Sequence, residues 1–164
     1  MAIRQIREEH DEILRKKSRK VEKIDSKVLT LLDDMAETMK SVDGLGLAAV
    51  QVGVLRRIVV INVADDSDEV LELINPEIID RKGKQNEIEG CLSCPGQYGY
   101  TNRPRAVTIS AFDRKGRSFE ITGEELLARA FCHELDHLEG ILFTDHAEML
   151  TKEQIEEMEK QKDK

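Results

Sequence analysis

The sequence lacks any long apolar segment. None of its 164 residues lie in a run of the roughly 18 apolar residues that a membrane-spanning helix needs, and the N-terminus has no apolar run typical of a secretion signal. Cysteine is also scarce, at three residues, which argues against a disulfide framework and fits a reducing compartment. We therefore expect a cytoplasmic protein that does not bind membranes.

Positive charge is in the minority. The chain has 25 lysine and arginine residues against 33 aspartate and glutamate residues, and the formal net charge of −8 argues against nonspecific binding or direct readout of nucleic acid. Internal repeats and low-complexity linkers are absent as well. A chain of this length can bury one substantial core, so we expect residues 1–164 to form a single domain.

Hydrophobic periodicity predicts helices and strands that are segregated along the chain more than they alternate. A helix is expected over 27–42, capped by Asp25 or Ser26, and a charged helix over 151–164. The expected strands are 58–63 and 70–74 around an acidic turn at 64–69, one or two short strands between 76 and 88, and a hairpin of 106–113 with 118–121. This order favours an α+β fold, with small, mostly antiparallel or mixed sheets packed around a central helix and a further helix near each end.

The most informative segment spans His133 to His137 and reads HELDH. On a helix, residues four apart lie on the same face, so both imidazoles can reach one metal ion. Glu134 then lies beside that ion, where its carboxylate can accept a proton. The surrounding sequence predicts the helix, with Thr122 as a candidate N-cap and Gly140 as a candidate stop.

Two histidines leave a hydrolytic metal site incomplete, because such a site takes three protein ligands and keeps one open position. The candidate third ligands are cysteines. Cys132 neighbours His133 but lies about 100° around the helix from it, so it is poorly aimed. Either one cysteine of the pair Cys91 and Cys94 completes an open site, or both close a structural site of four ligands. The long separation between the cysteine pair and the histidine pair favours the open site.

Three blocks of the sequence resemble the peptide deformylase family. They are 44–51 (GLGLAAVQ), 89–93 (EGCLS) and 133–137 (HELDH), and they occur in the family's order and at its spacing. There are two departures: Cys132 stands where the family commonly has glutamine, and no proline precedes Pro76. Neither departure affects a residue that is expected to bind metal.

The resemblance implies an activity and a metal site. By this resemblance Cys91, His133 and His137 bind one divalent metal ion, and Glu134 is the general acid and base. The family hydrolyses the formyl group from the N-terminal methionine of newly synthesised polypeptides and releases formate. Its members use ferrous iron and commonly accept nickel, cobalt or zinc. Thiolate and imidazole ligands alone suggest zinc, so the expectation of iron follows only from the resemblance.

The resemblance also implies partners for the oxygen that becomes negative during attack. Gln51 would donate its side-chain amide to this oxygen, and Leu92 its backbone N–H. Glu89 either orients a metal ligand or lies at the surface.

The peptide substrate needs a binding surface and an apolar pocket for methionine. Glycines allow close backbone approach, so an extended peptide can pair with the first block as an added strand; a glycine-rich turn before a buried strand is the alternative. The residues expected to contact the substrate are Gly44, Leu45, Gly46, Leu126 and Ala130, together with Tyr98 and Gly99 in a loop after Pro95. For this loop an ordinary turn is an equal alternative.

The last segment, 151–164, mixes charges of both signs. A solvated helix is the simplest interpretation, and docking on the ribosome, where formylated nascent peptides emerge, is the alternative. For the site, a general metallopeptidase and a non-catalytic protein with a structural metal are the rival functions.

Overall fold

The computed structural model describes residues 2–63 and 69–162. The helices are α1 (Ser26–Ser41), α2 (Leu126–Leu138) and α3 (Lys152–Lys162), with short 3-10 helices η1 (Glu12–Arg15), η2 (Ala49–Val52) and η3 (Phe143–Asp145). The strands are β1 (Gly46–Ala48), β2 (Ile58–Asn62), β3 (Val70–Lys82), β4 (Gln85–Cys91), β5 (Cys94–Arg103), β6 (Ala106–Phe112), β7 (Ser118–Glu124) and β8 (Glu148–Met149). The acidic turn expected at 64–69 lies outside the described residues, except for Glu69.

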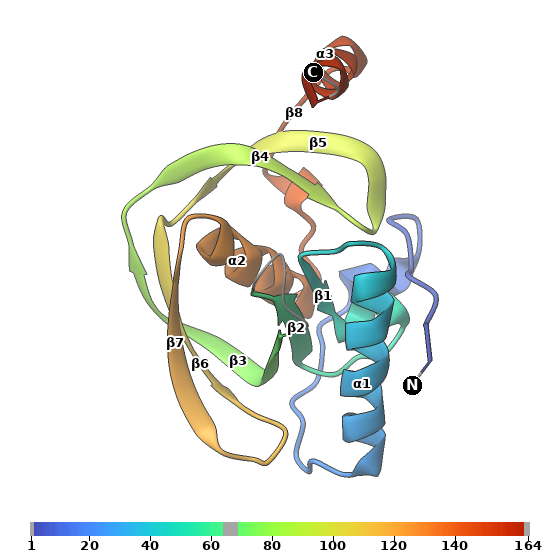
Figure 1. Cartoon of the computed structure of the whole chain (residues 1–164), viewed down its shortest axis with the longest axis vertical. Helices are drawn as coiled ribbons and strands as arrows, with labels where there is room; N and C mark the ends of the chain where they lie inside the picture. Colours follow the sequence, from blue (N-terminus) through green and yellow to red (C-terminus); the bar gives the residue numbers. More distant parts are fainter. Residues whose placement is uncertain (1, 64–68, 163–164) are drawn as a thin grey trace.

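The strands form two antiparallel sheets around α2. The first has the order β1-β2-β3-β6-β7 and the second the order β4-β5-β8. In Figure 1 the long strands of both sheets curve around α2, and α1 lies on the other side of β1 and β2. The expected α+β fold, with a central helix and a helix near each end, is confirmed.

Strand β2 is buried on both faces. Side chains alternate along a strand, and here Val59 and Ile61 join the core around α2, whereas Ile58 and Val60 join the core beneath α1. Full burial of each such side chain contributes roughly 1.5–3 kcal/mol. The uninterrupted apolar run at 58–61 therefore reflects a strand that separates two helices.

Helix α1 follows its predicted pattern. Of the two candidate caps, Asp25 occupies the N-cap position, and its carboxylate accepts a hydrogen bond from the Val28 N–H at 3.1 Å. Its apolar stripe faces the core: the fully or nearly fully buried members are Leu31, Leu32, Met35 and Met39.

Strand β3 differs from the prediction. The sequence predicted that a strand would end at residue 74 and that short strands would follow Pro76, but one strand runs from Val70 to Lys82. Its register shifts beside Pro76, and Asn75 adopts a φ of 53°, so the proline lies in a bulge where no ladder donor is required. The Asn75 side chain also bonds both backbone groups of Val21, which fixes the N-terminal segment to this bulge.

Two local predictions were wrong. Tyr98 and Gly99 lie within strand β5 and not in a loop. Thr122 lies in β7 and caps nothing; α2 begins directly after Glu125, whose φ of 52° turns the chain sharply out of the strand. The predicted stop is confirmed, because α2 ends two residues before Gly140, which has a φ of 74°.

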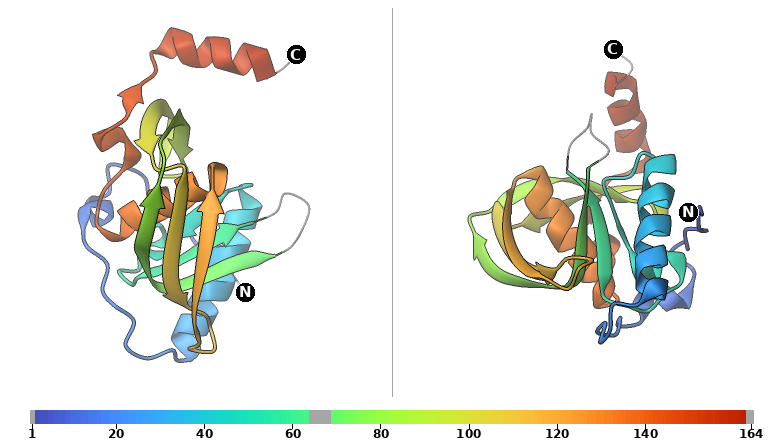
Figure 2. Two further views of the ribbon diagram at one scale, coloured as in Figure 1. Left: turned by 90° about the vertical axis from the view of Figure 1, so that its left-hand side faces the viewer. Right: turned by 60° about the horizontal axis from the view of Figure 1, so that its bottom comes forward.

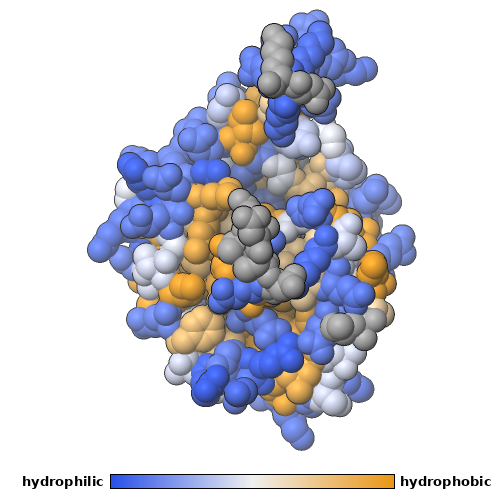
Figure 3. Space-filling view, in the orientation of Figure 1, coloured by the Kyte–Doolittle hydropathy of each residue, from blue (hydrophilic) through white to orange (hydrophobic). Residues whose placement is uncertain are grey.

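Helix α3 projects from the body of the molecule. It contains no buried residue, and Figure 2 shows it at the far end of the molecule, beyond the short strand β8. On the face drawn in Figure 3 its surface is mainly hydrophilic. Among the described residues, none of the helices combines the length and apolar character needed to cross a membrane.

Candidate metal centre

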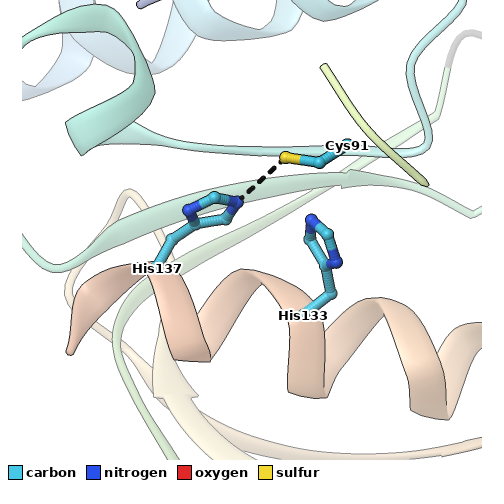
Figure 4. A group of neighbouring side chains, drawn as sticks. All are labelled: Cys91, His133 and His137. Atoms are coloured by element: carbon cyan, nitrogen blue, oxygen red, sulfur yellow. Dashed lines mark hydrogen bonds between the residues drawn. The ribbon is translucent and has the colours of Figure 1, made fainter. Parts of the chain in front are cut away.

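Helix α2 and the end of strand β4 bring three potential ligands together. His133 and His137 lie one turn apart on α2, and Cys91 faces them from the last position of β4, as Figure 4 shows. One donor atom from each residue lies within 4.8 Å of the others, and the distance from Cys91 Sγ to His137 Nε2 is 3.4 Å. One sulfur and two imidazoles suit a divalent transition metal, so the residues present fit the expected ion.

The other cysteines do not belong to this group. Among the described residues the cluster consists of Cys91, His133 and His137, and neither Cys94 nor Cys132 contributes to it. The arrangement is therefore the open one, with three protein ligands, that the sequence favoured over a closed site of four ligands.

A buried network fixes the orientation of His133. Glu89 accepts a hydrogen bond from His133 Nδ1 at 2.9 Å and two from Arg103, at 2.9 and 3.1 Å, and the Thr101 hydroxyl also donates to it. Burial by itself raises the pKa of Glu89, but the hydrogen bonds from His133 and Arg103 lower it to about 2. An ionised Glu89 holds the proton on Nδ1 and leaves Nε2 of His133 for a metal.

The same arginine ties the network back to α2. Arg103 donates through its third nitrogen to Asp136 at 2.8 Å, so one guanidinium joins β4 to the metal-binding helix. The pKa of His137 is lowered well below its usual value, first by burial and then by the neighbouring His133. His137 is therefore a neutral imidazole at physiological pH, which is the form that binds metals.

Glu134 is buried beside the ligands. Burial raises its pKa to about 7, so the carboxyl can exchange a proton near neutral pH. Its carboxylate lies against the backbone of Gly46, where an added Cβ would come within 2.8 Å of Glu134 Oε2. Glycine at position 46 thus gives this carboxylate the space it occupies.

Gln51 is held with its amide nitrogen toward the ligands. Its Oε1 accepts a hydrogen bond from the Ala48 N–H at 2.9 Å, while Nε2 donates to Ser93 Oγ at 3.1 Å and lies 3.7 Å from Cys91 Sγ. The side chain is only 1% exposed, so its orientation is fixed by these contacts.

A cavity of about 330 Å³ opens over these groups. The predicted site residues that line it are Gly44, Leu45, Gly46, Gln51, Glu89, Cys91, Leu92, Tyr98, Leu126, Ala130, His133 and Glu134. Gly99 does not line it: an added Cβ there would meet Ala147 and Met149, so this glycine makes room for the β8 segment. A larger groove of about 660 Å³, beside the start of α1, contains none of the predicted site residues.

Two unpaired strand edges accompany this cavity. Strand β1 is the edge of the first sheet and β4 the edge of the second, and residues of both line the cavity.

Comparison with known proteins agrees with this geometry. The family model for polypeptide deformylase matches residues 3–153. The chain belongs to the peptide deformylase family. It is 59% identical over 145 residues to the peptide deformylase of Acetivibrio thermocellus, covering 88% of this chain and 84% of that protein. It is 53% identical over 161 residues to that of Thermoanaerobacter pseudethanolicus, covering 98% and 99%.

Comparison with solved structures also finds peptide deformylases. The crystal structure of a peptide deformylase from Legionella pneumophila superposes with a TM-score of 0.86 at 40% identity, covering 99% of each chain. The chain is thus a peptide deformylase, a metal-binding hydrolase that removes the N-formyl group from nascent peptides.

Several residues of this deformylase site were not predicted from the sequence. They are Ile88, Ser93, Thr101, Arg103 and Arg129. Strand pairing places Gly99 opposite Glu89, and Thr101 and Arg103 follow at alternate positions on the same face of β5. A prediction of β5 as a strand paired with β4 would therefore have identified the partners of Glu89.

Proposed function

We propose that Cys91, His133 and His137 bind one divalent metal ion and that Glu134 acts as general acid and base. A cation held there supplies Lewis acidity, which lowers the pKa of water toward neutrality. The observation that carries this proposal is the convergence of the three donor atoms within 4.8 Å beside a buried carboxyl whose pKa is about 7.

Glu134 moves the proton in this mechanism. Its carboxylate takes the proton from the attacking water and later delivers it to the amine nitrogen that leaves when formate forms. Because burial raises its pKa to about 7, neither protonation state is strongly disfavoured at neutral pH, and the group can serve in both steps.

Gln51 and Leu92 stabilise the oxygen that becomes negative. The amide nitrogen of Gln51 is held toward Cys91 by its contacts with Ala48 and Ser93, and Leu92 lies next to Cys91 in the turn that ends β4. Fixed donors of this kind need no reorganisation during the reaction, and the loss of one typically reduces turnover by about 10²–10³.

The peptide lies between the two strand edges. Gly44, Leu45 and Gly46 pair with its backbone on one side, and the cavity walls formed by Leu126 and Ala130 receive the methionine side chain. Tyr98 lines this cavity and contacts the residues after methionine. Gly99 acts on the peptide site only indirectly, because it makes room for β8 beside β5. Glu89 orients His133.

The bound metal in the cell is ferrous iron, an assignment supported by the family resemblance, and zinc, nickel or cobalt can replace it. Iron held by a thiolate is sensitive to oxygen. Metal analysis of protein purified without oxygen tests this assignment, and stoichiometric zinc in such a sample would contradict it.

Residues 1–164 act as one catalytic domain in the cytoplasm, with 151–164 as a charged tail. The lack of buried residues in α3 supports a solvated helix, and docking on the ribosome is the alternative for the same segment.

Replacement of Glu134 by alanine tests the mechanism. The variant should retain stoichiometric metal, because the ligands are unchanged, and should lose formate release from formyl-methionyl peptides by at least about 10²-fold. Near-normal turnover would overturn the assignment. An N-acetylated peptide assayed in parallel separates a deformylase, which leaves it intact, from a general metallopeptidase, which cleaves it internally.

A further inference from the structure

Cys94 is a buried thiol that the proposed mechanism does not use. It is 1% exposed and lies directly opposite Cys91 across the turn that joins β4 to β5. Only Leu92 and Ser93 separate the two cysteines in the chain, and their Cα atoms are paired across the hairpin.

The position of this pair suits a disulfide. Residues directly opposite each other on antiparallel strands have Cα atoms about 4.5–5.5 Å apart and side chains on the same face. Disulfides need Cα separations of about 4.4–6.8 Å, so this register meets the requirement without movement of the strands. Cys132 lies on α2, outside the group formed around Cys91.

We propose that Cys94 is a resolving cysteine, which captures Cys91 as a disulfide after a peroxide has oxidised it. In the first step the Cys91 thiolate attacks the peroxide, an S–O bond forms, the O–O bond breaks, and the departing hydroxide takes up a proton. In the second step the Cys94 sulfur attacks the Cys91 sulfur, the S–S bond forms, and the oxygen leaves as water with the Cys94 proton. In total the two thiols lose two electrons, and these reduce one molecule of peroxide.

The exposure of the two residues matches their roles. Cys91 is partly exposed and lines the cavity, so a small oxidant can reach it. Cys94 needs no access to solvent, because its only reaction partner is the adjacent sulfur. Without Cys94, the sulfenic acid of Cys91 would continue to sulfinic and sulfonic acids, which thiols do not reduce.

The disulfide has a consequence for the metal that rests on the proposed ligand role of Cys91. A sulfur in a disulfide is no longer an anionic ligand, so the ion would be held by two imidazoles and released. Reduction by a dithiol restores the ligand, and the enzyme recovers once metal is supplied. Mass mapping measures formation of the disulfide and metal analysis measures release of the ion, so the two claims are tested separately.

Peroxide treatment of the zinc-loaded enzyme, in which the metal cannot itself reduce the peroxide, followed by peptide mass mapping, tests the proposal. The wild type should lose about 2 Da in the peptide that contains both cysteines, whereas Cys94→Val should gain about 32 or 48 Da at Cys91. After treatment with a dithiol and addition of metal, formate release should return to within about twofold of its starting value in the wild type but not in Cys94→Val. Cys132→Ala is the matched control and should behave like the wild type.

If Cys94→Val does not fold, the mass of the wild-type peptide still shows whether Cys91 forms a disulfide with Cys94. Cys94→Ser then serves as the second variant. Oxygen addition at Cys91 in the wild type, or a disulfide that involves Cys132, would overturn the proposal. A Cys91–Cys94 disulfide that forms without loss of metal would support the resolving role and instead contradict the assignment of Cys91 as a ligand.

Discussion

At the scale of single residues, the contact between Gly46 and Glu134 sets the room available to the carboxyl that we propose as the general acid and base. Gly46 does not have a positive φ, so alanine at this position would not strain the backbone. Its Cβ would, however, come within 2.8 Å of Glu134 Oε2. Glycine is required here because of the close approach and not because of a turn.

We expect Gly46→Ala to displace Glu134 and to reduce formate release by about 10–100-fold, because misplaced catalytic groups lose rate steeply, while metal content is unchanged. Assays of turnover and metal on the same sample measure this. Gly96→Ala is a contrasting variant: the φ of 76° strains the backbone of alanine, but an added Cβ meets nothing within 4 Å, so this variant should lose stability and keep its turnover. Equal turnover in wild type and Gly46→Ala would mean that Glu134 tolerates displacement.

The pKa of Glu134 predicts the pH dependence of the reaction. Burial raises this pKa to about 7, and only the ionised carboxylate can accept a proton, so kcat/KM should fall as the pH decreases below that value. A bound cation favours the ionised form, so the midpoint should lie at or below about 7 in the loaded enzyme. A pH profile at constant metal content measures it. His10→Asn, which alters an exposed histidine outside the cavity, should leave the profile unchanged, and a rate that declines from about pH 5 to 7 would contradict the role.

At the scale of secondary-structure elements, Arg103 connects strand β4 to helix α2. It neutralises Glu89, which orients His133, and also binds Asp136 on the next turn of the helix. The exposed pair formed by Arg105 and Glu125 lies close by in the sequence and joins no site residue. The two arginines therefore allow a matched comparison of a buried and an exposed ion pair.

We expect Arg103→Met to lower the free energy of unfolding by about 3–5 kcal/mol, because it leaves the buried Glu89 without its cation. Metal affinity should fall by about 10–100-fold as His133 loses its fixed orientation. Arg105→Met should change stability by no more than about 1 kcal/mol. Denaturant titration and chelator competition give both values. A loss of stability with unchanged metal affinity would confine Arg103 to a structural role.

The sequence predicted those elements whose signal is local. The apolar stripe and Asp25 cap of α1, and the spacing of His133 and His137 on α2, needed no tertiary information. Strand β5 was missed because its residues 94–103 include a proline, two glycines and many polar side chains, and it is stabilised by pairing with β4 and β8. Pro76 suggested a strand end, whereas the structure accommodates it in a bulge.

The same distinction applies to the site. The ligand motif and the glycine block could be recognised in the sequence, but Arg103, Thr101 and Ser93 could not. Arg103 and Thr101 reach Glu89 only because β4 pairs with β5, and Ser93 becomes relevant only through its hydrogen bond with Gln51. The Cys91–Cys94 contact likewise depends on the two-residue turn between β4 and β5. Positions set by the pairing of β5, a strand without an apolar pattern, were therefore the ones that sequence patterns did not reveal.

At the scale of the whole molecule, the catalytic body and α3 are joined through β8. Met149 pairs with Gly99 of β5, and the Leu150 N–H bonds to the Tyr98 carbonyl at 2.8 Å. Beyond this point no described residue of α3 is buried, and the family model ends at residue 153. We therefore expect the boundary between body and tail to lie close to Leu150.

Deletion of the residues after Leu150 should leave turnover within about twofold of the full chain and the free energy of unfolding within about 1 kcal/mol, because almost no apolar surface is lost. A longer deletion that starts at Ala147 is the contrasting variant. It removes β8 and the strand pairing beside Tyr98, so it should reduce both quantities. Co-sedimentation with ribosomes then separates the two interpretations of the tail: unchanged binding after the short deletion rejects docking by α3, whereas loss of binding with intact turnover supports it and rejects a merely solvated helix.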